Sequence, residues 1–110
     1  MTEKYFGISR RRLDELIEEA TVDAYGEAEE HTGLLTIIED HVVCPFRAKV
    51  IGEVVEVKAL EWPPSGYGLM AVCEYKGKTY RLDITTLEWP PPHPEGFEWI
   101  VAYLAWRENL

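Results

Sequence analysis

Apolar residues recur at three- and four-residue spacing in two segments near the start of the chain. Between about Ser9 and Tyr25 this spacing predicts a helix with one apolar face, capped by Ser9 and ended by Gly26. A second helix is predicted over residues 27–41, where Gly33 indicates a bend or close packing because glycine weakens a helix. The two helices are expected to form a helical hairpin.

After Pro45 the period changes to two residues, which is typical of half-exposed strands. Four short strands are predicted, with a bend at Gly52 and a tight turn at Lys76-Gly77. They cover residues 46–50, 55–59, 69–75 and 78–83. A short C-terminal helix is expected over residues 96–107, after a proline-rich extended stretch. The predicted fold class is α+β.

The expected order is an N-terminal helical hairpin (9–41), a small antiparallel β-barrel or sheet of SH3-like size (46–83) and the closing helix (96–107). A chain of 110 residues with 46% hydrophobic content is expected to form a single domain, residues 1–110. No apolar run approaches the roughly 20 residues needed to cross a bilayer, so no membrane partner is expected. Cys44 and Cys73 make no disulfide framework and indicate buried thiols in a reducing cytoplasm.

The charge is unevenly distributed along the chain. The net charge of −9 argues against a large phosphate-binding surface, so no nucleic-acid partner is expected. From Leu13 to His41 there are ten carboxylates and no Lys or Arg. Surfaces usually mix both signs of charge, so this acidic segment requires an explanation.

Catalytic motifs are absent from the sequence. There is no nucleophile elbow, no Walker loop and no glycine-rich dinucleotide motif, so an enzyme is not expected. His41 and Cys44 form one HxxC pair, but a structural zinc site needs four ligands, and Cys73 and His93 would have to converge on it from separate elements. The simpler interpretation is core cysteines and surface histidines.

The carboxylates offer more specific chemistry. Asp23, Glu27 and Glu30 fall at i, i+4 and i+7, and Glu39 and Asp40 lie in the last turn of the second helix, where the dipole disfavours acids. Two carboxylates about 6 Å apart repel by roughly 3 kcal/mol at an effective dielectric of 20. A divalent cation would turn this repulsion into binding energy, and Ca²⁺ accepts carboxylate, carbonyl and water oxygens. The EF-hand pattern is absent, so the residues alone leave two alternatives open, a cation site and a solvated acidic face.

Several short blocks of the chain resemble the cyanobacterial calcium-binding protein (CcbP) family. They are residues 18–27 (EEATVDAYGE), Ile38-Glu39-Asp40 followed by Pro45-Phe46, and Pro94-Glu95-Gly96 followed by 98–103. The resemblance implies a cytosolic buffer or sensor that binds Ca²⁺ without an EF-hand and regulates calcium-dependent differentiation, such as heterocyst formation. Carried over to this sequence, it implies metal ligands at Asp23, Glu27, Glu39 and Asp40, with Glu30 next.

The alternative hypothesis is a non-enzymatic protein–protein adaptor with a small β-barrel and an acidic docking face. Glu61-Trp62-Pro63-Pro64 recurs as Glu88-Trp89-Pro90-Pro91, and an apolar patch around the two tryptophans would favour this hypothesis. It would require a protein partner, which the sequence does not identify.

Overall fold

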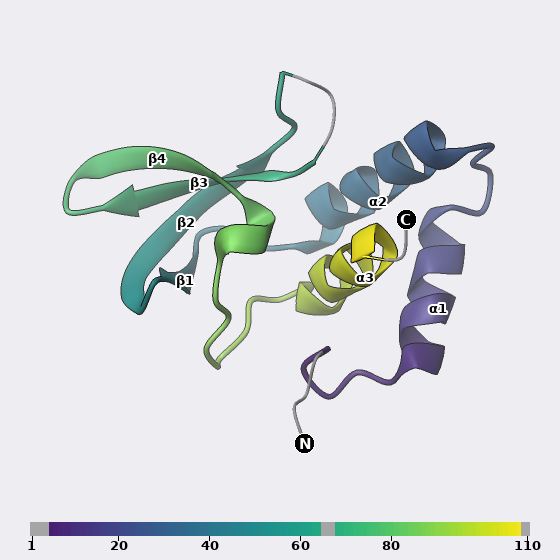
Figure 1. Ribbon diagram of the computed structural model, residues 1–110, viewed down its shortest axis with the longest axis horizontal. Coiled ribbons are helices and arrows are strands. Elements are labelled where there is room, and N and C mark those ends of the chain that lie inside the picture. Colours follow the sequence, from purple (N-terminus) through teal and green to yellow (C-terminus); the bar gives the residue numbers. More distant parts are fainter. Residues whose placement is uncertain (1–4, 65–67, 109–110) are drawn as a thin grey trace. The chain divides into compact units, whose positions relative to one another are not determined.

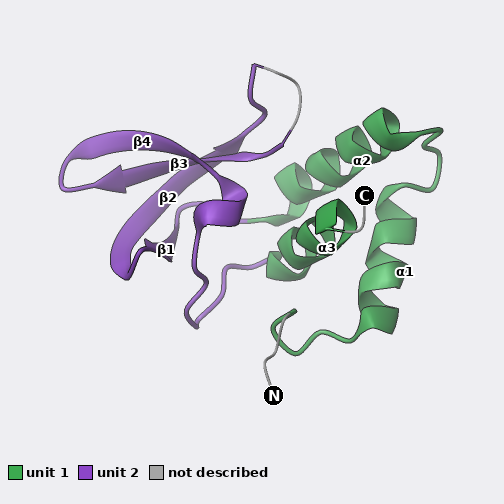
Figure 2. Cartoon of the chain, in the orientation of Figure 1, with its two compact units in different colours: residues 1–42, 96–110 green, residues 43–95 purple. Residues whose placement is uncertain are grey.

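The computed structural model describes residues 5–64 and 68–108 and has the predicted α+β fold (Figure 1). The helices are α1 (Arg10–Ala20), α2 (Glu27–His41) and α3 (Phe97–Glu108), with a short 3₁₀ helix η1 (Ile84–Thr86). The strands are β1 (Phe46–Val50), β2 (Glu53–Glu61), β3 (Met70–Tyr75) and β4 (Lys78–Asp83). The chain divides into two compact units (Figure 2): a helical unit of residues 1–42 and 96–110, and a sheet unit of residues 43–95. That the whole chain is a single domain stays a prediction.

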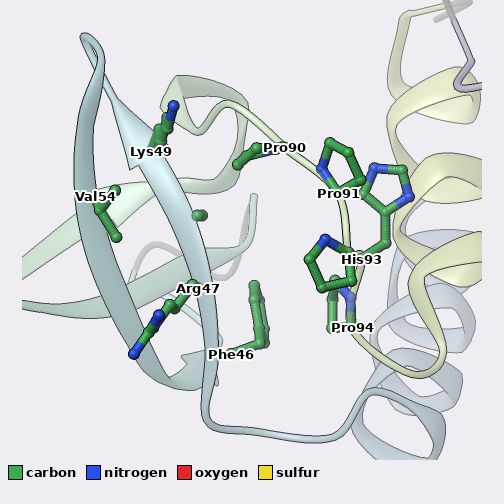
Figure 3. A pocket seen from close by; sticks show the side chains of 10 residues that line it. Phe46, Arg47, Lys49, Val54, Pro90, Pro91, His93 and Pro94 are labelled. Carbon is green, nitrogen blue, oxygen red and sulfur yellow. The ribbon is translucent and has the colours of Figure 1, made fainter.

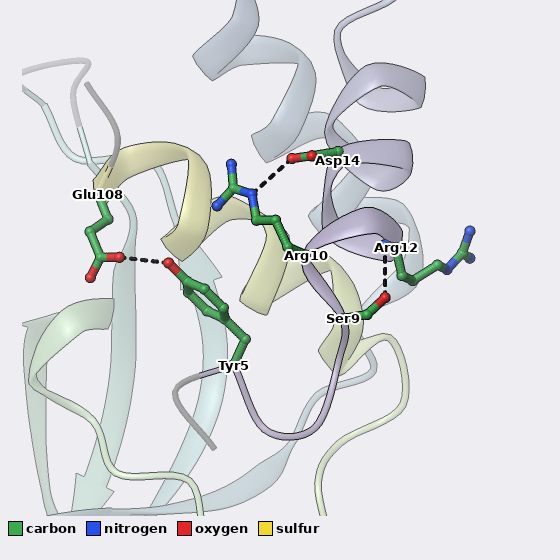
Figure 4. Close-up of polar contacts among 6 residues, drawn as sticks. All are labelled: Tyr5, Ser9, Arg10, Arg12, Asp14 and Glu108. Carbon is green, nitrogen blue, oxygen red and sulfur yellow. Dashed lines mark hydrogen bonds and ion pairs between the residues drawn. The ribbon is translucent and has the colours of Figure 1, made fainter. Parts of the chain in front are cut away.

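Helix α1 begins at the predicted N-cap. The Ser9 hydroxyl oxygen accepts a hydrogen bond from the Arg12 backbone N–H at 3.1 Å (Figure 4). The arginines of the first turn have acidic partners within the helix. Arg10 pairs with Asp14 at 3.0 Å, and Glu15 pairs with both Arg12 at 3.2 Å and Arg11 at 4.0 Å. These exposed pairs explain why three arginines occupy the positive end of a helix, although each contributes only about 0.3–0.5 kcal/mol.

Helix α1 ends at Ala20, earlier than the predicted end at Tyr25. The Thr21 hydroxyl and backbone N–H both donate to the Ile17 carbonyl, at 2.7 and 3.0 Å, which closes the last turn. Beyond it, Val22 is 75% and Tyr25 87% exposed, so a longer helix would bury no further apolar side chain. The prediction that Gly26 ends the first helix is therefore wrong, because Gly26 is the N-cap of α2 with φ +106°.

The close packing predicted at Gly33 is confirmed. A Cβ atom at Gly33 would collide with the carbonyl oxygen of Ala20, so only glycine lets α2 approach the end of α1 this closely. Leu34, Leu35 and Ile38 of α2 are buried, and Ile37 is partly exposed. The hairpin thus depends on one residue without a side chain.

Helix α3 packs against α1 and α2 and supplies the buried Phe, Tyr and Trp side chains of the helical unit. Eight of its twelve residues are buried. They are Phe97, Trp99, Ile100, Val101, Ala102, Tyr103, Ala105 and Trp106. The Tyr5 hydroxyl donates to a Glu108 carboxylate oxygen at 2.6 Å, which links the N-terminal segment to the end of α3 (Figure 4). Within the described residues, no helix combines the length and apolar character needed to traverse a bilayer.

The sheet unit is an antiparallel meander in the order β1-β2-β3-β4. Its two tight hairpin turns, Ile51-Gly52 and Lys76-Gly77, each have positive φ at both residues, as type I′ turns require. The predicted barrel is wrong, because among the described residues β4 and β1 do not pair and the sheet stays open. The outer edge of β1 instead forms an isolated bridge, in which Lys49 and Glu88 exchange backbone hydrogen bonds of 3.0 and 2.7 Å.

Replacing Gly33 by alanine should destabilise the protein. Helix propensity alone predicts that Gly33→Ala raises the free energy of unfolding by about 1 kcal/mol. The collision with the Ala20 carbonyl reverses this sign, and overpacking costs about 1–3 kcal/mol. Urea denaturation measures the change, with Thr36→Ala, at an exposed position of the same helix, as the control. A more stable Gly33→Ala protein would show that the two helices are not in close contact.

Candidate metal centre

The five predicted metal ligands lie near the two ends of α2. Asp23 is exposed in the turn before the helix, while Glu27 and Glu30 are in its first turn. Glu39 and Asp40 are exposed in its last turn. Glu27 and Glu39 are twelve residues apart in one helix, so their backbones are separated by about 18 Å at 1.5 Å per residue. Since calcium–oxygen distances are about 2.3–2.6 Å, the two groups cannot bind the same ion in this conformation.

At the N-terminal end, Glu30 differs from its neighbours because it is partly buried. Its carboxylate accepts a hydrogen bond from the indole N–H of Trp106 at 2.9 Å. This bond joins α2 to α3 and fixes one carboxylate oxygen, whereas Glu27 is exposed. An indole N–H is neutral, so the bond orients the Glu30 carboxylate without cancelling its charge.

The same end of α2 contains an acidic residue that was not among the predicted ligands. Asp23 and Glu29 both line a hollow of about 290 Å³ beside Ala20 and Gly33. The Glu29 carboxylate accepts a hydrogen bond from the Tyr25 backbone N–H at 2.9 Å, which holds it at the turn. The structure therefore brings Asp23 to the same hollow as Glu29. In the sequence, Glu29 could have been recognised as a candidate from its position in the first turn of α2.

At the C-terminal end of α2, the backbone leaves its helical path directly after the two acids. The Val42 N–H donates to the Ile38 carbonyl at 2.8 Å and closes the last turn. The Val43 N–H, which would bond the Glu39 carbonyl in a longer helix, donates instead to the Glu95 carbonyl at 3.2 Å. The carbonyl oxygens of this helix end therefore lie beside the carboxylates of Glu39 and Asp40.

No complete metal site is assembled in the described conformation. Among residues 5–64 and 68–108, no three Asp, Glu, His or Cys side chains form a group that could hold a metal ion. This applies equally to the zinc pattern of His41, Cys44, Cys73 and His93. The calcium ligand set implied by the resemblance stays a prediction.

The histidines and cysteines have structural surroundings. His31 is 3% exposed, so its prediction as a surface residue is wrong. Its Nε2 atom lies 3.3 Å from the Tyr103 hydroxyl oxygen, and its ring centroid lies 5.9 Å from that of Trp106. Cys44 and Cys73 are free thiols, and burial raises the pKa of both above the ordinary value of 9.0.

The two tryptophans of the repeated motif have different surroundings. Trp89 is buried and stacks on Phe46 with ring centroids 5.8 Å apart, whereas Trp62 is 43% exposed. A groove of about 550 Å³ lies between β1 and the proline-rich segment, with Arg47 and Lys49 on its β1 side (Figure 3). Because Trp89 is buried, the two tryptophans do not form the exposed apolar patch that would favour an adaptor.

The three helices, the four-stranded sheet and the acidic segment from Leu13 to His41 together define an α+β protein with an acidic helical hairpin. Its fold is similar to the crystal structure of Anabaena CcbP, with a TM-score of 0.75 and 18% identity over 92% of this chain and 94% of that chain. The resemblance found in the sequence is therefore confirmed at the level of the fold. Comparison with protein-family models and with curated protein sequences gives no match.

The raised pKa of Cys73 predicts that the protein loses stability in alkaline solution. The folded state holds the thiol proton more tightly than the unfolded state, so this stabilisation is complete below pH 9.0 and is lost as the pH rises above it. Urea denaturation between about pH 8 and about pH 10 should show a smaller decline for Cys73→Ala than for the wild type. An equal decline in both proteins would contradict the prediction.

Proposed function

We propose that this chain is a cytosolic, non-enzymatic protein that binds Ca²⁺ through carboxylates without an EF-hand. The observation that carries the proposal is the segment from Leu13 to His41, which has ten carboxylates and no Lys or Arg. The sequence resemblance to the CcbP family and the fold similarity to Anabaena CcbP support it. The free thiols of Cys44 and Cys73 are in keeping with a reducing cytosol.

The charge distribution explains why a cation would bind to the helical hairpin. Asp14 and Glu15 pair with the arginines at the start of α1. The other eight carboxylates of the segment have no Lys or Arg within it. A dipositive ion near either end of α2 would offset repulsion that otherwise opposes folding.

The positions of the carboxylates favour two separate, weak sites. Ca²⁺ takes six to eight oxygens, and each end of α2 offers only a few carboxylates, so carbonyls and water would complete each shell. Sites with few protein charges bind Ca²⁺ weakly, and the proposal covers both a buffer and a sensor. The proposal extends to regulation of calcium-dependent differentiation, such as heterocyst formation, for which the sequence resemblance is the support.

Calorimetric titration of paired variants tests both ends of α2. Asp23→Asn with Glu27→Gln, and separately Glu39→Gln with Asp40→Asn, remove two charges from one end and should each abolish one binding event. The control, Glu61→Gln with Glu74→Gln, removes two charges from exposed residues of the sheet unit and should bind like the wild type. Unchanged binding in both α2 variants would mean that the ligands lie elsewhere.

Calcium should also raise the thermal denaturation midpoint. A ligand that binds only the folded state stabilises it by about 2.7 kcal/mol at a hundredfold excess over Kd. The midpoint should therefore rise with CaCl₂ and much less with MgCl₂ at equal ionic strength. Equal shifts with both salts would reduce the effect to charge screening and contradict a calcium site.

A further inference from the structure

One face of the sheet contains an apolar hollow that the calcium proposal does not use. Its volume is about 480 Å³, within the usual range for small-molecule sites of about 300–1,000 Å³. The hollow is lined by Val50, Ile51, Glu53, Val55, Cys73, Tyr75, Tyr80 and Leu82. All of them belong to the strands and one hairpin turn of the sheet unit.

The strand register places these residues on a common face. Val50 pairs with Glu53, and Cys73 pairs with Tyr80, so side chains from all four strands gather there. Val54, which is 53% exposed, points to the opposite face because successive strand residues alternate. The hollow is therefore a property of one sheet face and can be altered separately from the other.

Two residues of the hollow are unusual for a free surface. Ile51 occupies a turn position with φ +48°, where Asn or Gly is usual and a β-branched residue is rare, and it is 89% exposed. Tyr80 is 43% exposed beside it in the same lining. Together with the apolar lining they extend the hollow into a contiguous apolar patch, a feature of interaction and ligand-binding sites.

The polar groups of the lining indicate the charge of that ligand. Glu53 is the charged side chain among the lining residues, and its carboxylate accepts a hydrogen bond from the Tyr75 hydroxyl at 2.6 Å. The Lys76 ammonium of the chain itself lies 5.3 Å from the centroid of the Tyr75 ring. A carboxylate beside tyrosine rings attracts cations, and the Lys76 contact shows one such cation–π arrangement at the rim.

We propose that this hollow binds a small hydrophobic cation, an organic molecule with an apolar ring system and a positively charged nitrogen. The apolar part would lie against Val50, Val55 and Leu82, and the charge would lie near Glu53 and Tyr75. This site lies in the sheet unit and is independent of the calcium sites proposed on α2.

Thioflavin T, a cationic aromatic dye, is the probe, and the anionic dye 8-anilinonaphthalene-1-sulfonate is its counterpart. We expect saturable, one-to-one binding of thioflavin T by fluorescence titration, and weaker binding of the anionic dye. The titration is done with and without excess CaCl₂, and the site predicts similar dye binding in both. Absence of saturable binding, or equal affinity for both dyes, would overturn the proposal.

Two matched lysine variants separate the hollow from the general attraction of a cation to a protein of net charge −9. Val50→Lys puts an ammonium in the hollow beside Glu53, while Val54→Lys adds the same charge on the opposite face. Val50→Lys should weaken thioflavin T binding by about tenfold, or ~1.4 kcal/mol, and Val54→Lys should leave it nearly unchanged. An equal loss in both variants, or a loss only in Val54→Lys, which lines the groove of Figure 3, would overturn the proposal.

A third variant keeps the test decisive if Val50→Lys does not fold, as judged by circular dichroism. Glu53→Gln removes the charge and retains an acceptor for the Tyr75 hydroxyl. It should weaken thioflavin T binding without weakening the anionic dye. Unchanged thioflavin T binding by Glu53→Gln would show that the carboxylate does not recognise a cation.

Discussion

Repulsion among the carboxylates of residues 13–41 is the constraint on which the helical unit depends. Two such charges about 6 Å apart repel by roughly 3 kcal/mol at an effective dielectric of 20, against a typical total stability of 5–15 kcal/mol. Contacts within the helical unit offset part of this repulsion. Arginines of the first turn of α1 pair with Asp14 and Glu15, and neutral N–H donors hold Glu29 and Glu30. If the chain binds Ca²⁺ as proposed, the ion would offset part of the remaining repulsion, and ion binding would stabilise the folded state.

The sequence predicted those elements whose signals are local. The two-residue period and the Lys76-Gly77 turn were sufficient to place the strands, and the apolar spacing placed α2 and α3. The end of α1 was missed because Ala20 and Ala24 continue the spacing although little is buried after Thr21. The barrel was wrong because closure depends on pairing between the first and last strands, a long-range contact that no local pattern specifies.

The candidate site was predictable to the same extent. The sequence showed that acids crowd both ends of α2, because that follows from their positions along one helix. The sequence did not show which of these carboxylates lie close together in the folded protein, or which other side chains they contact. The bond between Glu30 and Trp106 spans 76 residues, and the contact between His31 and Tyr103 spans 72, so neither follows from helical spacing. The pairing of Asp23 with Glu29 in one hollow depends on the early end of α1 and on the close approach at Gly33.

The central claim, that a dipositive ion accounts for the base-free acidic hairpin, is tested most directly by a crystal structure grown in excess CaCl₂. The account predicts an ion at one or both ends of α2, bonded to carboxylate oxygens of Asp23 or its neighbours, or of Glu39 and Asp40, at about 2.3–2.6 Å. Carboxylates at both ends that contact only water in such a crystal would contradict it.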